Sequence, residues 1–438
     1  MHKYFAIISS LLIFSGMSTA QKTGNSPYSR YGIGDIDRSG FSFNRAMGGI
    51  STGLRKANFV NYLNPASYTS QDSMSFVFDL GGSYNYKALQ TTTQEARNYI
   101  GNVDYLAASF PVSKRWAASF GLVPYSRVGY SYKESEVITD PYGFSKNPIY
   151  TYTGSGGVYQ AYVGTAVKLF NRLSLGVNAS YLFGSINHDY SITYPTSQTK
   201  VFETFIERDI RVGDIMLNYG LQYEARLSEK NKIIVGLTFD NATNVKARYN
   251  YLYYANYRGS NVSYPSSNDT ITKNTGAISS IQVPSNLGIG LSYCYDNRLI
   301  VGFDYHMQDW SKARFHDSID LAMKASNSVR FGLEYTPVYN ITSARSYFET
   351  VHYRLGAQYN NTNLLLNGES ITDFRISAGI GLPIPSGPLY KKVRNEFSIA
   401  AELGQRGTTA NNLIRERYCM ITCSFRFYEF WFYRRKYD

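Results

Sequence analysis

The chain has 438 residues and a formal net charge of +12, and it contains 41 Tyr, 25 Phe and 36 Gly, whereas only 17% of its residues are charged. The mean hydropathy of -0.30 excludes a helical membrane protein, which needs long apolar runs, and so much tyrosine is rare in soluble α/β enzymes. Short alternating segments rich in Tyr and Phe favour a membrane β-barrel with aromatic girdles at both interfaces. The basic residues are scattered, so we expect them to meet the phosphates of outer-membrane lipids and lipopolysaccharide, and we expect no nucleic-acid partner.

The N-terminus has the pattern of an export signal. Lys3 supplies a short positive region, residues 6–14 an apolar core, and Ser18-Thr19-Ala20 a small-residue cleavage site. The apolar core is too short for a membrane helix, which needs about 20 residues. We therefore expect residues 1–20 to be a signal peptide and the mature chain to begin near Gln21.

Residues 21–72 contain turn residues every few positions and show no strand periodicity. A segment of this kind at one end of a barrel fits inside the lumen as a hatch, or plug. Gly48 and Gly49 lie in its middle, and Asn64-Pro65-Ala66 lies near its end. Because Asn caps turns and Pro fixes the backbone, this tripeptide predicts a turn that terminates a hatch segment.

Residues 73–428 contain fourteen segments with apolar residues at alternate positions. We expect strands at about 74–88, 102–112, 114–132, 156–170, 172–192, 212–228, 231–252, 277–294, 298–312, 325–337, 349–361, 370–384, 393–408 and 413–428. In hydrocarbon no water satisfies an open sheet edge, so the first strand must pair with the last. The sequence thus predicts an all-β fold, a 14-stranded antiparallel transmembrane β-barrel with an N-terminal hatch in its lumen.

The connections between these strands have two different lengths. Tight turns are expected at Ser113-Lys114, Asn171-Arg172, Glu229-Lys230 and Asp296-Asn297. Long loops without apolar periodicity and rich in Tyr, Ser, Asn and Thr are expected at residues 133–155, 193–211 and 253–276. Bacterial outer-membrane barrels have short turns in the periplasm and long loops outside. An even number of strands then puts both termini in the periplasm. The Tyr-rich loops are suited either to amphipathic ligands or to a neighbouring protein.

The third strand contains Pro124, which has no N–H to donate to a strand ladder and is therefore confined mainly to edges, strand ends and bulges. Gly121 and Gly129 flank it and permit a local distortion. These three residues predict a kink in the wall. Alternatively, Pro124 lies at the membrane boundary, where water satisfies the backbone.

Candidate catalytic chemistry is sparse. Asp304 and His306 point to one face of a strand, with Asp309 nearby, so they form either a metal or acid–base site or simply lumen-facing polar residues. No pattern nominates a nucleophile with its base, so we expect no enzyme activity, no metal and no cofactor. We interpret the cysteines, which show no CxxC spacing, as small buried apolar residues: Cys294, Cys419 and Cys423.

Residues 429–438 follow the last strand as an aromatic and then basic periplasmic tail. It has two interpretations, a segment that binds another protein or an interfacial anchor whose rings lie at headgroup level and whose cations meet phosphates. The residues concerned are Phe430, Trp431, Phe432, Arg434, Arg435 and Lys436.

Together these features resemble the FadL/TodX family of outer-membrane transport proteins, fourteen-stranded barrels plugged by an N-terminal hatch. Asn64-Pro65-Ala66 is similar to the NPA motif of the family's hatch, and the glycine-rich RAMGG precedes it at residues 45–49. The late-strand segments VPSNLGIGLSY, VGFDYHMQDWSK and YRLGAQY are also similar to the family. The opening SPYSRYGIGD and the closing EFWFYRRKYD are similar to a Bacteroidetes-like branch. The resemblance covers most of the mature chain in architecture but is patchy in its motifs.

The resemblance implies that the hatch motif belongs to a hinge region that rearranges for a substrate, and that the kink at Pro124 opens the wall sideways. The leading hypothesis is an outer-membrane channel for passive uptake of hydrophobic or amphipathic small molecules, without ATP or a redox cofactor. The alternative is a non-transporting barrel subunit or adaptor of a larger outer-membrane complex, in secretion or protein insertion. The tail, the long loops and the polar lumen favour this alternative, whose partners are other outer-membrane or periplasmic proteins.

Overall fold

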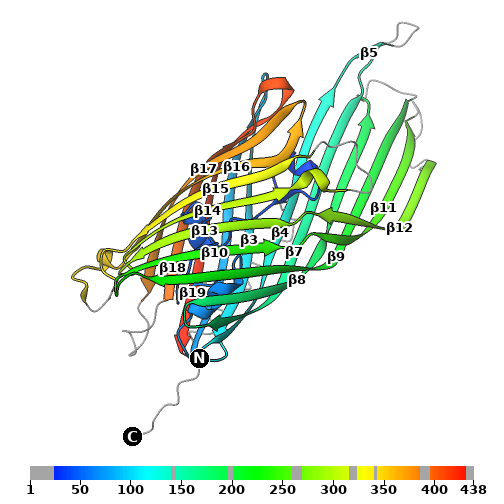
Figure 1. Cartoon of the computed structure of the whole chain (residues 1–438). Coiled ribbons are helices and arrows are strands. Elements are labelled where there is room, and N and C mark those ends of the chain that lie inside the picture. The colour runs from blue at the N-terminus through cyan, green and yellow to red at the C-terminus, as the bar shows by residue number, and fades with distance from the viewer. Residues whose placement is uncertain are drawn as a thin grey trace, which may run out of the picture.

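The computed structural model describes residues 24–139, 145–195, 201–258, 269–314, 323–339, 343–384 and 395–430. Over these residues the chain forms a closed antiparallel β-barrel (Figure 1). The last strand, β19 (Arg415–Phe430), pairs with the first wall strand, β2 (Ser75–Gln90), and this pairing closes the cylinder. None of the described helices is long and apolar enough to cross a bilayer. The predicted fourteen-stranded barrel is confirmed.

Twelve of the fourteen positions in the wall are single strands and two are broken into two pieces each. Between β2 and β19 the order is β3 (Glu95–Pro111), β4 (Trp116–Ser135), β7 (Ile149–Leu169), β8 (Leu173–Thr193), β9 (Val201–Arg226), β10 with β11 (Asn231–Asp240 and Thr243–Arg258), β12 with β13 (Asp269–Val283 and Asn286–Tyr295), β14 (Leu299–Asp309), β15 (Ala325–Tyr335), β16 (His352–Leu366), β17 (Glu369–Ile384) and β18 (Asn395–Arg406). The two interruptions lie opposite each other, and Pro284, which cannot donate to the ladder, lies in one of them.

The alternation of side chains explains why these segments are strands. In β13 the residues alternate strictly between buried and exposed. Leu287, Ile289 and Leu291 point outward, where lipid surrounds the barrel, whereas Asn286 and Ser292 point into the lumen. The same parity shows that the interpretation of the cysteines holds for only one of them. Cys294 is buried, but Cys419 is only partly buried and Cys423, on the same face of β19, is exposed.

The two ends of the barrel differ, as predicted. The four expected tight turns connect β3 to β4, β7 to β8, β9 to β10 and β13 to β14, and we call this side the turn end. At the opposite side, the loop end, β7, β8, β9, β11 and β12 continue far past the remaining strands as a curved sheet (Figure 1). A small hairpin of β5 (Ile138–Thr139) and β6 (Ser145–Lys146) also lies there.

The expectation of long irregular loops at residues 133–155, 193–211 and 253–276 is therefore wrong for most of these residues. They form strands that neighbouring rings hold together, such as Phe205 with Tyr254, whose centroids lie 5.1 Å apart, and Tyr152 with Tyr190 at 4.8 Å. Tyr and Thr favour strands through such cross-strand contacts. Apolar alternation arises only where one face meets lipid, so a strand that continues beyond the membrane lacks it.

The segment before β2 lies inside the barrel (Figure 1). It contains two 3₁₀ turns, η2 (Pro27–Arg30) and η3 (Pro65–Ser70), the two-residue strand β1 (Asp35–Ile36) and the short helix α2 (Ser42–Ala46). We call residues 24–72 the plug. Its apolar side chains pack into the lumen wall, and one such cluster joins Phe43, Met47 and Ile50 to Cys294 and Ile300 of the wall. The core of the protein is thus the contact between the plug and the inner face of the barrel.

Three further 3₁₀ turns lie in the connections: η4 (Trp310–Lys312), η6 (Tyr347–Glu349) and η7 (Ala410–Asn412). The expected signal peptide and the tail after Phe430 lie outside the described residues.

Candidate functional site

Ion pairs join the plug to strands on several sides of the lumen. Lys56 Nζ lies 2.6 Å from Glu334 Oε1 of β15, and Arg45 Nη1 lies 3.2 Å from Glu402 Oε2 of β18. The remaining pairs are Arg38 with Asp240 at 3.0 Å, Asp35 with Arg406 at 2.7 Å and Arg55 with Glu224 at 3.5 Å. Removing one partner of a buried pair costs about 3–5 kcal/mol, because the other charge is left uncompensated. The plug is therefore held electrostatically on β9, β10, β15 and β18.

A second layer of charges lies in the wall beneath the plug. Arg354 Nε lies 2.8 Å from Glu334 Oε2, and its Nη2 lies 2.7 Å from Glu396 Oε1. The guanidinium carbon of Arg354 also lies 4.4 Å from the centroid of the Phe43 ring of the plug, a cation–π contact. Because Glu334 serves both Lys56 and Arg354, the plug shares its counter-charges with the wall.

The NPA motif lies against two glycines of the wall. Asn64 caps η3 by accepting a hydrogen bond from the Ala66 N–H at 3.2 Å, and its side-chain amide donates to the Thr52 carbonyl at 2.7 Å. Gly176 and Gly220 face each other across the β8–β9 ladder directly beneath this turn. A Cβ on Gly176 would lie 2.5 Å from the Pro65 carbonyl carbon, which no real side chain tolerates. The predicted turn is present, and its role as a hinge stays a prediction.

Gly48 and Gly49 are in a similar position on the other side of the lumen. Gly48 has a φ of +65°, a left-handed conformation that glycine adopts without strain. Its N–H donates to Ser377 Oγ at 2.9 Å. Beneath it, Gly332 and Gly356 face each other across the β15–β16 ladder, and a Cβ on either would overlap with the backbone of Met47.

A third wall pair, Gly236 with Gly290, lies beneath Thr52 and Gly53. We call the three pairs the glycine belt: Gly176, Gly220, Gly236, Gly290, Gly332 and Gly356. Sequence reasoning missed this belt. The sequence signal for the belt is a glycine that recurs at lumen-facing positions of several strands. This recurrence cannot be recognised from one strand alone.

The wall is interrupted at the predicted kink. β3 and β4 pair only from Leu106 with Leu122 to Pro111 with Ala117. Immediately above, the pairing of β4 with β7 shifts register between Pro124 and Ser126, which makes Tyr125 the extra residue of a bulge. Gly121 lies in the paired half of β4, below this point. Lateral exit of a ligand at this kink stays a prediction.

The plug occupies the edge of β4 that β3 leaves free. Asp35 pairs with Arg127, Ile36 pairs with Ser126, and Ser26 forms an isolated bridge with Gly129. The Asp37 N–H donates to the carbonyl of the bulged Tyr125 at 3.1 Å. Arg127 also reaches across the gap, where its Nη2 lies 2.5 Å from Asp104 Oδ1 of β3.

Charged and apolar side chains share the lining of the cavity behind this gap. The cavity has a volume of about 160 Å³, and Lys87, Arg127 and Glu416 are among the residues that line it. Lys87 and Glu416 form an ion pair at 3.0 Å. An apolar molecule that crossed this cavity would have to pass this buried ion pair.

Asp304 and His306 point into the lumen and bind the plug. Asp304 Oδ2 accepts hydrogen bonds from the backbone N–H groups of Ser51 at 2.6 Å and Thr52 at 2.8 Å. His306 Nε2 lies 3.2 Å from Thr52 Oγ1. Asp309 is separate from them, because it caps η4 and pairs with Lys312 at 3.3 Å. Among the described residues, no group of three His, Cys, Asp or Glu side chains is placed to hold a metal ion.

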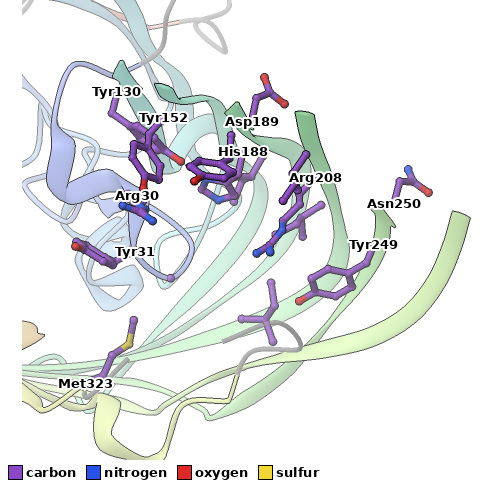
Figure 2. Close-up of a pocket in the computed structure, with 16 residues that line it drawn as sticks. Arg30, Tyr31, Tyr130, Tyr152, His188, Asp189, Arg208, Tyr249, Asn250 and Met323 are labelled. Atoms are coloured by element: carbon purple, nitrogen blue, oxygen red, sulfur yellow. The ribbon is translucent and has the colours of Figure 1, made fainter. Parts of the chain in front are cut away.

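A larger cavity of about 530 Å³ opens at the loop end, and we call it the mouth pocket. Figure 2 shows Arg30, Tyr130 and Tyr152 on one side of it and Arg208 with Tyr249 on the other. The Arg30 guanidinium carbon lies 4.5 Å from the centroid of the Tyr152 ring, and the Arg30 side chain also donates to the Tyr132 hydroxyl. The lining is mostly apolar surface with two cations at its rim, which suits an amphipathic molecule.

Of the predicted tail, only the first aromatic residue is described. Phe430 is the last residue of β19, where it pairs with Ser75, and its ring packs edge-on against Tyr428 with centroids 5.5 Å apart. Trp431, Phe432, Arg434, Arg435 and Lys436 lie outside the described residues.

Comparison with solved structures supports the same architecture. The monoaromatic hydrocarbon channel CymD has 15% sequence identity and a TM-score of 0.57, over 91% of this chain and 100% of that chain. The toluene transporter TbuX of Ralstonia pickettii has 14% identity and a TM-score of 0.56, over 89% and 99%. The toluene transporter TodX of Pseudomonas putida has 15% identity and a TM-score of 0.57, over 92% and 100%.

Identities this low show a shared fold and no more. No curated protein matches the chain. A family model does match, and it covers residues 1–438: the protein belongs to the BamG family.

Proposed function

We propose that this protein is a closed barrel subunit, or adaptor, of a larger outer-membrane complex, the β-barrel assembly machinery suggested by the name of its family. The family match over the whole chain supports this assignment. The protein lies in the bacterial outer membrane with both termini in the periplasm, as the position of the tight turns suggests. Its partners are other outer-membrane or periplasmic proteins, in addition to lipids and lipopolysaccharide.

The observation that carries the proposal is the electrostatic attachment of the plug. Lys56 with Glu334 and Arg45 with Glu402 are buried pairs on different wall strands. Each pair that opens leaves an uncompensated charge at a cost of about 3–5 kcal/mol, so a plug that moved for every transported molecule would break several such pairs at once. A barrel closed in this way acts through its outer surfaces.

Two surfaces are suited to contact partners. The sheet of β7, β8, β9, β11 and β12 projects at the loop end, and it displays large apolar side chains such as Phe202, Ile271 and Ile278. At the turn end β19 ends at Phe430, and the sequence from Phe430 to Lys436 holds four aromatic residues and three cations. Aromatic and arginine side chains are enriched where proteins bind one another.

Native co-purification tests the proposal. The full-length protein, tagged at a described surface turn such as Ser228, is isolated from native membranes in mild detergent, beside a version truncated after Phe430 that retains all of β19. We expect the full-length protein to bring down barrel-assembly proteins and the truncated version to lose part of them. A full-length protein that elutes alone from native membranes would contradict the adaptor function.

A second candidate is passive uptake of hydrophobic or amphipathic molecules, with plug rearrangement and lateral exit. The mouth pocket favours it, as do the fold shared with hydrocarbon channels and the interrupted wall at Pro124. The ion pair in the cavity behind the gap argues against it, because an apolar molecule would have to pass Lys87 and Glu416.

The Tyr152→Ala variant separates the two candidates, because it removes the ring that packs on Arg30 in the mouth pocket. Transport predicts slower uptake of labelled toluene or a fatty acid into cells, with unchanged co-purification of partners. The adaptor function predicts that deletion of the protein leaves uptake unchanged.

A further inference from the structure

Four arginines of the described chain are almost completely buried, and one of them has no carboxylate within ion-pair distance. Three of them are 4% exposed or less, and each has two carboxylates within 3.5 Å: Arg45, Arg354 and Arg426. Arg330 of β15 is also 4% exposed, yet no carboxylate among the described residues lies within 4.0 Å of it. A guanidinium cannot lose its proton in a protein, so this charge needs compensation.

The contacts of Arg330 leave part of its guanidinium group unused. Nη1 donates to two carbonyl groups of the plug, that of Arg38 at 3.0 Å and that of Gly49 at 2.9 Å. Nε has no partner. Asp304 lies directly opposite on β14, but its Oδ2 is engaged by the amides of Ser51 and Thr52.

Arg330 lines a cavity of about 160 Å³ between the plug and the wall. Three further arginines line it, and each forms an ion pair with a carboxylate: Arg38 with Asp240, Arg406 with Asp35, and Arg375 with Glu402, which it shares with Arg45. The Nε atoms of Arg375 and Arg406 are also buried without a hydrogen-bond partner. Unpartnered donors of Arg330, Arg375 and Arg406 therefore border this space, together with the carboxylates of Asp35 and Asp373 and the Gln358 Oε1, which also has no partner.

We propose that this cavity binds a small oxyanion, with Arg330 as its principal ligand. The anion supplies the negative charge that Arg330 lacks, and the planar guanidinium matches the oxygen spacing of phosphate and carboxylate groups. The volume of the cavity suits a free anion rather than a lipid headgroup with its acyl chains. Because Arg330 also holds two carbonyl groups of the plug, the bound anion strengthens the attachment of the plug to β15.

Equilibrium dialysis with radiolabelled inorganic phosphate tests the site. The full-length protein is purified in detergent without oxyanions, and its fold is checked by its heat-dependent electrophoretic mobility. We expect the wild type to retain a single phosphate per barrel and its Tm to rise with phosphate relative to chloride at equal ionic strength. The Arg330→Met variant loses both effects, and Arg330→Lys, which retains the charge but not the planar fork, binds phosphate at least tenfold more weakly.

The matched control is Arg226→Met, which removes one positive charge from an exposed position paired with Glu224. It should bind phosphate as the wild type does. If Arg330→Met does not fold, the comparison of Arg330→Lys with the wild type decides. Failure of the wild type to bind phosphate or acetate, equal binding by the Arg330 variants, or displacement of phosphate by lipopolysaccharide alone would overturn the proposal.

Discussion

Asp35 of the plug lies directly opposite Arg127 in the ladder of wall strand β4, so a two-residue strand of the plug occupies the place that β3 leaves free. The Arg127 side chain then crosses to Asp104 of β3. Arg127 thus joins three parts of the protein. It belongs to β4, its backbone position pairs with Asp35 of the plug, and its side chain contacts Asp104 of β3.

Loss of this side chain should loosen the gap. We expect Arg127→Met to destabilise the attachment of the plug by about 1.5–3 kcal/mol, the usual contribution of a hydrogen bond to a charged group. Hydrogen–deuterium exchange should then become faster in β1 and in residues 123–130. The control is Arg97→Met, which removes the same charge from an exposed position of β3 that is not part of the contact between Arg127 and Asp104. Equal exchange in both variants would show that Arg127 does not hold the gap closed.

The glycine belt should tolerate no side chain. In Gly220→Ala the added methyl group would overlap with Asn64 and Pro65, so the NPA turn must move away from the wall. We expect the free energy of unfolding in urea to fall by about 1–3 kcal/mol, the usual cost of overpacking. Gly101→Ala is the matched control, because a Cβ there would lie 3.9 Å from its nearest neighbour. A Gly220→Ala barrel as stable as the control would show that the plug does not press on the belt.

The shared carboxylate Glu334 should be the most sensitive position of the plug attachment. Glu334→Gln leaves both Lys56 and Arg354 short of a counter-charge, and we expect a loss of about 3–5 kcal/mol of stability. The exposed Glu229→Gln serves as the control.

A double-mutant cycle with Lys56→Met isolates the pair that crosses from the plug to the wall. Because the two residues interact directly, the double variant should lose less stability than the sum of the single variants. Additive losses would mean that Lys56 and Glu334 are not coupled. Conductance across planar bilayers reports whether the weakened plug also opens the lumen.

The attachment of the plug should survive moderate acid. Burial alone would raise the pKa of Asp37, but the guanidinium groups of Arg45 and Arg127 outweigh burial and lower that pKa from 3.8 to about 2. Because the pKa is lower in the folded protein, the stability contributed by Asp37 is fully present above about pH 4 and is lost as the pH falls toward 2.

Protease resistance of the plug, measured between pH 5 and pH 2, tests this expectation with an acid-active protease. Asp37→Asn should already be weakened at pH 5 and should change less on acidification. A wild type that releases its plug at pH 5 would contradict the argument.

The wall could be predicted from sequence because the lipid imposes a pattern on each strand independently. Leu287, Ile289 and Leu291 point outward, and the residues between them point inward, whatever the rest of the chain does. Beyond the membrane this constraint ends. The Tyr-rich residues of β11 were therefore expected to form a loop, although they continue the strand.

The interior could not be predicted, because it depends on contacts between distant residues. Nothing local identifies Glu402 as the partner of Arg45, which lies 357 positions earlier in the sequence. Gly290 and Gly356 were visible in segments that resembled a known family, but only the position of the plug explains why they carry no side chain. The unpaired charge of Arg330 likewise becomes apparent only when every other buried arginine has been matched.

The seam between β2 and β19 constrains how the protein is made. The plug precedes β2 in the chain, yet it ends up encircled by a ring that only the last strand can seal. A ring sealed too early would shut a highly charged segment out of its own interior. Biogenesis therefore has to wrap the sheet around a plug that is already in place, which makes the plug a template for the final closure.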